Sequence, residues 1–343
     1  MTTSTARNLF LTLFLALTVA GCGGGGGSTQ VAGGGTGGTG VSYGSVTGYG
    51  SVFVNGIEFN YDASSVSLDD DGQGELKIGM VVRVHHGDID DASSTGTADD
   101  IEYEDNVKGP IASITSSGGT FPYTLTVAGQ TIIVDGDSCN PSAVAPTPAL
   151  PSGHACLYDS NSTTPIGISD LAPGEVVEIS GLVDGTGAIR ATYIEREHST
   201  WNVITSKAEV KGRVSQLDTV AGTFRINDLT VGYSGATTED LPGGSLSDGD
   251  YVEVKGTIDS ATSLTPTMTA EQVQGESEGF DLSDSGEVEI EGYVSELTTS
   301  GFKIGAQEVD VSGAASCSGI TVNTRIEVEG SLVGGVLMAR DCS

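Results

Sequence analysis

One short pattern recurs four times along the chain and limits its fold more than any other feature. Each copy opens with a glycine that is followed two residues later by Val or Ile, at Gly44, Gly109, Gly212 and Gly292. Further along, each copy has a turn residue followed three and five places later by aliphatic residues; the turn residues are Gly79, Gly174, Gly249 and Asn323. Aliphatic residues with a period of two and polar residues between them are typical of a half-buried antiparallel strand. Repetition of such a unit predicts tandem small β domains.

The spacing inside each copy predicts three strands, a variable connection and then two more strands. Turn sequences join the second and third strands in three copies, at Asn55-Gly56, Asn227-Asp228 and Gly305-Ala306. Five- to six-stranded antiparallel units of this kind match a small Greek-key barrel of the OB type, in which closure removes exposed strand edges. We therefore expect an all-β chain of four tandem OB-like barrels, with a sandwich-like variant still open. Because 37% of residues are hydrophobic and 6% aromatic, we expect several small cores rather than one large core.

The repeats divide the chain into six expected segments. The first two, which precede the repeats, are a signal segment (1–21) and a Gly-rich tether (22–43). The barrels are expected at residues 44–107, 108–199, 207–276 and 286–343. The second copy carries a Pro-rich insertion before its fourth strand, which predicts a surface excursion.

The first residues predict a destination for the protein. Arg7 precedes the apolar run from Leu9 to Val19, which is short for a membrane span and typical of an export signal. The run ends in Val19-Ala20-Gly21-Cys22, which resembles the bacterial lipobox. The resemblance implies cleavage before Cys22, lipidation of its sulfur and, with Gly23 next in the chain, the outer membrane. An ordinary secretory peptide with an incidental cysteine is the alternative.

The repeats themselves resemble those of a known group of bacterial proteins. The shared features are the opening Gly-x-Val-Ser, a strand pair joined by a turn, and Leu-x-x-Gly-x-x-Val-x-Val, over most of residues 44–343. They are similar to bacterial lipoproteins with tandem copies of a small β domain of unknown function. Asn323 departs from the pattern, since it stands where the other copies have glycine. The resemblance implies no known activity.

Beside Cys22, the remaining cysteines are expected to form two disulfides. They are Cys139, Cys156, Cys317 and Cys342, and four cysteines allow three pairings. The local pairing is favoured because the first two flank one insertion and the last two lie within the last copy. An exported chain matures where disulfides persist. A zinc site is the sharper alternative, but there is no CxxC sequence and only His154 lies nearby.

Charge excludes some partners and suggests one ion. The formal charge of −32 would repel a nucleic acid, so no nucleic-acid partner is expected. Asp69, Asp71 and Gln73 before Gly74 partly imitate a calcium-binding loop, but Met80 stands where a bidentate glutamate is needed. We expect no cofactor, and calcium remains an alternative beside a merely solvated acidic loop.

The sequence gives no convergent catalytic set, so we do not expect an enzyme. His85 and His86 are adjacent, and neighbouring strand residues point to opposite faces, so the two rings are not expected to share an ion. The chain has neither a G-x-S-x-G elbow nor a phosphate-binding glycine loop that opens a helix.

We therefore expect a lipid-anchored outer-membrane protein that faces the periplasm or the cell surface. It would act as a non-catalytic interaction or spacer module with a protein or glycan partner in the envelope. A calcium-steadied protein for surface glycan binding or adhesion is the alternative. An envelope hydrolase that uses scattered carboxylates is a further, weaker reading.

Overall fold

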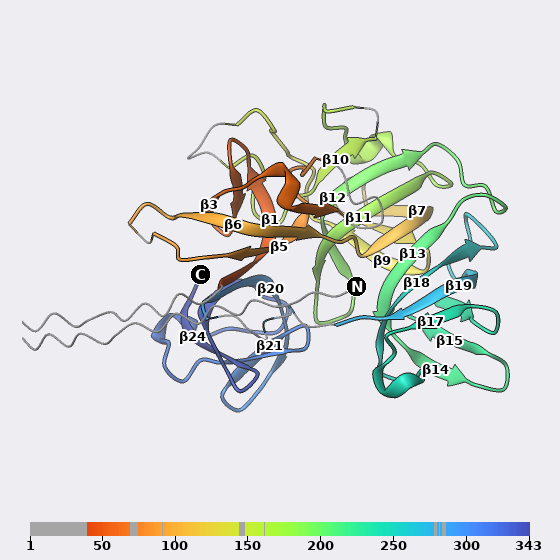
Figure 1. The fold of residues 1–343 in the computed structure, drawn as a ribbon. Coiled ribbons are helices and arrows are strands. Elements are labelled where there is room, and N and C mark those ends of the chain that lie inside the picture. Colours follow the sequence, from red (N-terminus) through yellow and green to blue (C-terminus); the bar gives the residue numbers. More distant parts are fainter. Residues whose placement is uncertain are drawn as a thin grey trace, which may run out of the picture. The chain divides into compact units, whose positions relative to one another are not determined.

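The computed structural model describes residues 40–68, 75–90, 92–143, 148–160, 162–277, 280, 282 and 286–343. The expected signal segment and most of the tether, including Cys22, lie outside these residues, as do Asp69, Asp71 and Gln73. The described chain is built from β-strands with four short 3₁₀ turns, which confirms the all-β expectation (Figure 1). No helix within the described ranges has the length and apolar character needed to cross a membrane.

Repeat 1 is a closed five-stranded barrel. Its strands follow the order β1-β2-β3-β6-β5 and return to β1, with β3 and β6 parallel and the other pairs antiparallel. This is the Greek-key order expected for an OB-type barrel. A short additional strand, β4, lies beside β6. The elements are β1 (Gly40–Gly48), β2 (Val52–Val54), β3 (Ile57–Asn60), η1 (Ala63–Ser65), β4 (Val66–Leu68), β5 (Val81–His86) and β6 (Thr95–Tyr103).

The turns between the second and third barrel strands follow the local sequence. Asn55 and Gly56 both have positive φ, +51° and +78°, as a type I′ turn requires. Ala128-Gly129 makes the corresponding turn in repeat 2 with φ of +49° and +76°. The predicted turns at Asn227 and Gly305 have a positive φ at their first residue. These hairpins set the register that places alternate residues inside each barrel.

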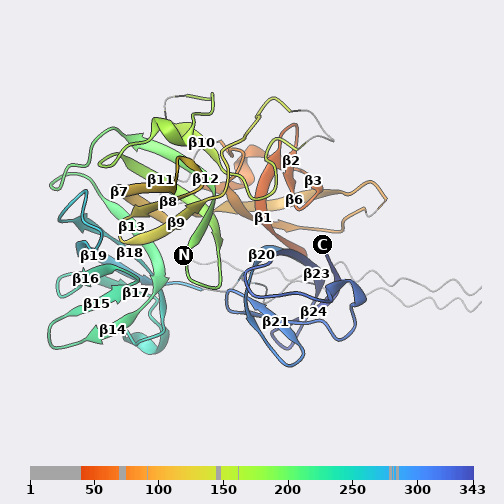
Figure 2. The ribbon, with the colours of Figure 1, turned by 180° about the vertical axis from the view of Figure 1, so that it is seen from behind.

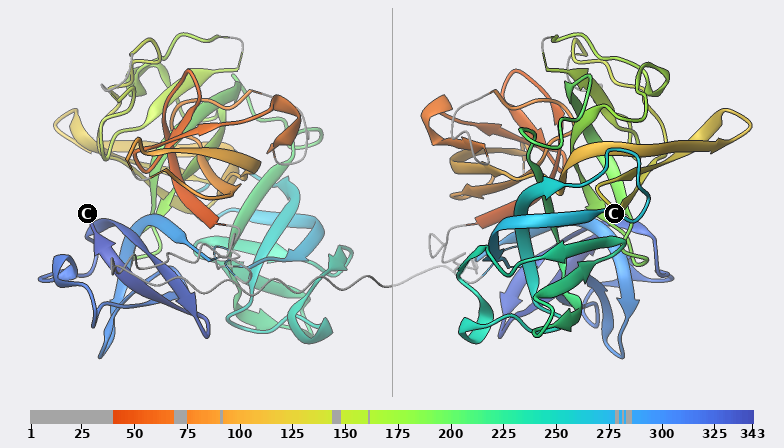
Figure 3. Two further views of the ribbon diagram at one scale, coloured as in Figure 1. Left: turned by 60° about the vertical axis from the view of Figure 1, so that its left-hand side comes forward. Right: turned by 90° about the vertical axis from the view of Figure 1, so that its right-hand side faces the viewer.

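Repeat 2 has the same topology and carries the insertion between β9 and β10. Its first two strands form a hairpin that extends beyond the rest of the barrel (Figure 3). Parallel pairing of β9 with β12 and antiparallel pairing of β11 with β7 close the barrel. The elements are β7 (Val107–Ser117), β8 (Thr120–Val127), β9 (Gln130–Val134), β10 (Cys156–Asp159), η2 (Ile168–Asp170), β11 (Val176–Val183) and β12 (Ile189–His198).

Repeats 3 and 4 close in the same way. In repeat 3 the first barrel strand is divided into β13 and β14, which pair with β18 and β15. Repeat 4 has a 3₁₀ turn, η4, in its connection, and Figure 2 shows this barrel in blue, seen from behind. The elements of repeat 3 are β13 (Ala208–Arg213), β14 (Ser215–Asp218), β15 (Thr223–Ile226), β16 (Leu229–Gly232), β17 (Thr237–Glu239), η3 (Pro242–Gly244), β18 (Tyr251–Ile258) and β19 (Thr267–Gly275). The elements of repeat 4 are β20 (Val288–Leu297), β21 (Gly301–Ile304), β22 (Gln307–Asp310), η4 (Ala315–Cys317), β23 (Arg325–Val333) and β24 (Val336–Cys342).

The barrels are joined in pairs by their first strands. Repeat 1 meets repeat 4 where β1 runs parallel to β20, from Val41↔Val288 to Tyr43↔Ile290. Repeat 2 meets repeat 3 where β7 runs antiparallel to β13, with Val107 opposite Val210. Two continuous sheets result, each of which contains two closed barrels.

The expectation of a separate core for each repeat is wrong for repeats 2 and 3. Their buried side chains form one continuous cluster, which includes Leu125 and Ile194 of repeat 2 and Phe224 and Val254 of repeat 3. At Gly109, on β7, an added Cβ would lie 3.0 Å from the Cβ of Ala128 in the same repeat and 3.6 Å from the Cβ of Ala208 in repeat 3. Pairing of the first strands therefore carries apolar packing from one barrel into the next.

The core of repeat 1 is also completed from outside the repeat. Ala149 and Leu150 of the insertion pack into it together with Tyr158 and Tyr193 of repeat 2. Repeat 4 has its own cluster, to which Val41 of repeat 1 contributes.

Candidate binding cleft at the repeat junctions

A large hollow in the described part of the chain lies where repeats 1, 2 and 3 meet. It has a volume of about 1590 Å³, and residues of all three repeats and of the linker before β13 line it. The lining is rich in charge, with more acidic than basic side chains. The acidic residues are Glu75, Asp105, Asp159, Glu175, Glu178, Glu195, Glu197, Glu209 and Glu271, and the basic residues are Lys77, Lys108, Arg196, Lys207 and Lys255.

An ion pair in the lining of the cleft joins repeat 1 to repeat 2. Lys77 Nζ lies 2.7 Å from both carboxylate oxygens of Glu195 and 5.7 Å from the ring centre of Tyr158. Tyr193, which is buried on β12 together with Glu195, donates its hydroxyl hydrogen to Glu195. Burial, with the nearby Glu195 carboxylate, raises the pKa of Tyr193, so its hydroxyl remains a donor.

A second contact between the same repeats also lines the cleft. Glu178 accepts hydrogen bonds from Tyr103 Oη at 2.8 Å and from Lys108 Nζ at 3.1 Å. Burial alone would lower the pKa of Lys108, but the carboxylates of Glu178 and Glu197 outweigh it and raise that pKa. Burial raises the pKa of Glu197, against the attraction of Lys108. The charged side chains of the lining therefore shift one another's pKa values and are partly removed from water.

The side of the cleft formed by repeat 3 uses the same chemistry. Lys255 Nζ lies 3.4 Å from Glu209 and 3.3 Å from Glu253. Lys207, in the linker, pairs with Glu271. Most cations of the cleft are thus engaged by its own carboxylates, and the surplus charge of the lining is negative. Such a surface attracts a cationic ligand and repels an anionic one.

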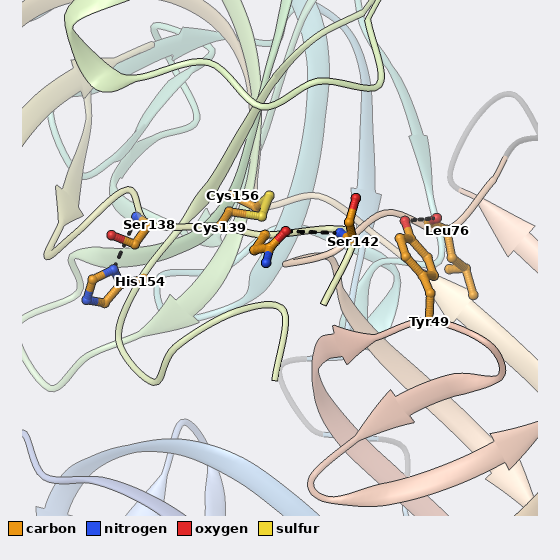
Figure 4. Close-up of a disulfide and its surroundings, with 8 residues drawn as sticks. Tyr49, Leu76, Ser138, Cys139, Ser142, His154 and Cys156 are labelled. Carbon is orange, nitrogen blue, oxygen red and sulfur yellow. Dashed lines mark hydrogen bonds between the residues drawn. A yellow bond between two sulfur atoms is a disulfide. The ribbon is translucent and has the colours of Figure 1, made fainter. Parts of the chain in front are cut away.

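The cysteines form two disulfides, Cys139–Cys156 and Cys317–Cys342, which is the pairing that the sequence favours. Cys139 lies in the insertion, and Cys156 begins β10. Figure 4 shows the first disulfide, with His154 Nδ1 accepting a hydrogen bond from the backbone N–H of Ser138 at 3.2 Å. His154 therefore acts in the structure of the insertion. The second disulfide joins η4 to the end of β24.

No calcium site is described. The expected calcium ligands lie outside the described residues, and within the described ranges no group of three or more His, Cys, Asp or Glu side chains could hold a metal ion. His198, at the end of β12, lines the cleft.

The two adjacent histidines point to opposite faces of β5, as expected. His85 is half-buried, whereas His86 is 1% exposed. The surroundings of His86 could not be predicted from the sequence: its Nε2 lies 3.2 Å from Ser42 Oγ. Ser42 Oγ in turn lies 3.2 Å from Glu289 Oε2 of repeat 4. Nothing in the periodicity links these residues, because the pairing of distant repeats brings them together.

This Ser–His–Glu group lacks the geometry of a nucleophile triad. In a triad the acid orients the histidine through Nδ1, and the serine oxygen is open to substrate. Here Nδ1 of His86 lies 2.7 Å from the carbonyl oxygen of Gly87, and Glu289 contacts Ser42 instead. Ser42 has no exposed surface. The group can hold protons, but its serine cannot reach a substrate carbonyl.

Comparison with protein families agrees with the repeat structure. The family model described as "Domain of unknown function (DUF5666)" matches residues 43–102, 156–195, 211–268 and 291–341. One match falls in each barrel, and the one in repeat 2 begins after the insertion, at β10. No curated protein matches the chain. Because the four matches together cover more than half of the sequence, the chain belongs to the DUF5666 family.

Proposed function

We propose that this protein is a lipid-anchored protein of the bacterial cell envelope whose four barrels form a non-catalytic interaction module. The observation that carries the proposal is the cleft between repeats 1, 2 and 3, which exists only because the barrels pack against one another. Linked copies of one scaffold gain binding surface at their junctions without a reactive centre.

The surplus of carboxylates favours a partner with exposed lysine or arginine side chains. Glu197 is the most informative lining residue, because it is partly buried beside Glu178 and Glu195 and has Lys108 as its nearby cation. A cation delivered by a partner would offset the repulsion among these carboxylates.

Calorimetric titration of the protein with synthetic oligolysine tests this binding. We expect heat of binding that weakens as salt is added, and no binding of oligoglutamate. Glu197→Lys should weaken oligolysine binding several-fold. Glu308→Lys, which makes the same charge change on β22 of repeat 4, should have a much smaller effect. Equal loss in both variants, or equal binding of both peptides, would contradict a role for the cleft.

The anchor is tested separately. In the full-length protein we expect Cys22→Ser to move the chain from the membrane fraction to the soluble fraction, because a lipid chain contributes about 0.8 kcal/mol per buried CH₂ group. Unchanged membrane association would contradict lipidation at Cys22. A calcium titration of the same protein decides the alternative that rests on Asp69, Asp71 and Gln73, since heat of binding would favour the calcium-steadied reading.

A further inference from the structure

Three buried polar side chains form a continuous chain across the junction of repeats 1 and 4. Ser42 on β1 is 0% exposed, His86 on β5 is 1% exposed and Glu289 on β20 is 7% exposed. Ser42 lies in the middle, with its Oγ 3.2 Å from His86 Nε2 and 3.2 Å from Glu289 Oε2. The parallel pairing of β1 with β20 places Ser42 directly opposite Glu289.

The hydrogen-bonding capacity of these atoms requires one additional proton. A carbonyl oxygen only accepts, so the 2.7 Å contact with Gly87 O fixes a proton on Nδ1 of His86. If His86 is neutral, its Nε2 accepts from Ser42, and Glu289 must then be protonated to donate to Ser42. If Glu289 is ionised, Ser42 donates to it, and Nε2 must then carry a proton to donate to Ser42. Both arrangements contain the same number of protons.

Removal of that proton leaves the chain incomplete. A neutral Nε2 and an ionised Glu289 would both be acceptors competing for the single hydroxyl hydrogen of Ser42. One of the two buried contacts would then be lost, and a buried acceptor without a donor is costly.

The surroundings favour keeping the proton. The acidic groups around Glu289 and His86 are Glu287 and Glu291 on β20, Glu327 and Glu329 on β23, Asp341 on β24 and Asp99 on β6. The nearby cations are Arg340, which pairs with Glu287 and Glu329, and Arg325, which pairs with Glu291; His85 lies beside His86.

The pKa directions agree with this inventory. Burial, with the repulsion of Glu327, raises the pKa of Glu289, and burial with the repulsion of Glu291 raises the pKa of Glu327, to which Glu289 is hydrogen-bonded. Burial lowers the pKa of His86. These directions favour a proton on the carboxyl side of Ser42, with Ser42 donating to a neutral His86. A cleft of about 630 Å³, lined in part by His86 and Glu289, lets water exchange the proton.

We propose that the junction of repeats 1 and 4 is a proton-binding site in which Ser42 relays one proton between Glu289 and His86, and that loss of this proton loosens repeat 4 from repeat 1. The proton leaves to water, and no bond between heavy atoms changes. The inference goes beyond the proposed function, because it concerns a different junction and a different ligand.

Amide hydrogen exchange in the intact chain tests the proposal. Exchange rates are corrected for the intrinsic effect of pH. The amides of Val41, which donates to Glu287 O at 2.9 Å, and of Tyr43 report on the β1–β20 pairing. We expect their protection to be constant near neutral pH and then to fall on the alkaline side by up to tenfold per pH unit, as loss of one proton requires. The amide of Lys211, which donates to Asn106 O at 3.1 Å where repeat 3 meets repeat 2, is the matched internal control.

Two variants separate the proton site from general alkaline weakening. Glu289→Gln supplies a permanent donor to Ser42, so protection of the Val41 and Tyr43 amides should stay flat across the same pH range. Glu308→Gln, which removes an acid elsewhere in repeat 4, should keep the alkaline fall of the parent. A parent without the fall, or a Glu289→Gln variant that retains it, would overturn the proposal.

Nitrogen-15 spectra of the histidine rings give an independent measurement. We expect His86 at neutral pH to be the Nδ1–H tautomer with a bare Nε2. A neutral His86 with its proton on Nε2 would refute the relay, because Ser42 would then satisfy an ionised Glu289 without a shared proton.

Discussion

The turn before the fourth barrel strand shows how one residue position acquires different roles in the four repeats. Gly79, Gly174 and Gly249 adopt nearly the same left-handed backbone, with φ of +96°, +93° and +97°, and Asn323 takes φ of +66°. An added Cβ would meet nothing within 4 Å at Gly174 or Gly249. At Gly79 it would lie 2.1 Å from the backbone oxygen of Thr192 in repeat 2.

Alanine substitution at these glycines should therefore separate backbone strain from contact between repeats. Gly174→Ala and Gly249→Ala should each cost about 1–2 kcal/mol, which is the left-handed strain of a residue with a Cβ. Gly79→Ala should cost clearly more, because the carbonyl of Thr192 would have to move. Urea unfolding of the three variants measures the difference. Equal losses at all three positions would mean that the close approach of repeats 1 and 2 contributes nothing.

This turn also marks the limit of what the sequence predicts. The requirement for a left-handed residue follows from the repeated glycine, and Asn323 fits because asparagine tolerates that region better than most residues. The sequence correctly predicted four closed barrels, because alternation and turn residues are local signals. The close approach of Gly79 to Thr192 could not be predicted, since the neighbour of a repeat leaves no periodic trace.

Among the elements, the β11–β12 hairpin of repeat 2 has a turn in which one carboxylate, that of Asp184, accepts several hydrogen bonds. Asp184 Oδ1 accepts hydrogen bonds from Thr186 N at 2.8 Å and Thr186 Oγ1 at 2.6 Å, and its Oδ2 accepts from Arg190 Nε at 2.9 Å. Burial alone would raise the pKa of Asp184, but the bonds from Thr186 and Arg190 outweigh it and lower that pKa. The turn thus depends on the ionised carboxylate.

Asp184→Asn should destabilise the protein in a pH-dependent way. A pKa that is lower in the folded than in the unfolded protein stabilises the fold above about pH 4, and this contribution is lost as pH falls. We expect a loss of about 1–3 kcal/mol at pH 7, which shrinks toward pH 3. Urea unfolding at the two pH values measures it. Asp310→Asn, at an exposed turn where Oδ1 accepts from Ser312 N, is the control and should lose less. A loss for Asp184→Asn that does not change with pH would contradict this account.

The β20 strand shows the same limit at the scale of an element. Its alternation of Glu289, Ile290 and Glu291 predicts a strand with a polar face, and the structure confirms the strand. In the structure this polar face meets repeat 1: Glu289 faces Ser42, and Glu291 accepts hydrogen bonds from Ser45, both on β1. Only the pairing of the first and last repeats turns this face into a junction, and neighbours so far apart in sequence cannot be predicted from one chain.

In the molecule as a whole, the barrels differ in how far their cores are shared. Repeats 2 and 3 are joined through one cluster of buried side chains, whereas the cluster of repeat 4 contains residues of its own barrel, of the preceding linker and Val41. Leu229 of repeat 3 is fully buried. It lies at the junction with repeat 2, since an added Cβ on Gly129 of that repeat would be 2.6 Å from the backbone nitrogen of Leu229. Leu337 is equally buried in repeat 4.

These two leucines allow the sharing of cores to be measured in the intact chain. Leu229→Ala and Leu337→Ala each create a cavity and should each cost about 2–5 kcal/mol locally. Because repeats 2 and 3 share one core, Leu229→Ala should also lower the hydrogen-exchange protection of the β8 and β9 amides in repeat 2. Leu337→Ala should weaken repeat 4 and leave β8 and β9 unchanged. Loss of protection in repeat 3 alone on Leu229→Ala would contradict this account. The two barrels would then unfold independently despite their common cluster of buried side chains.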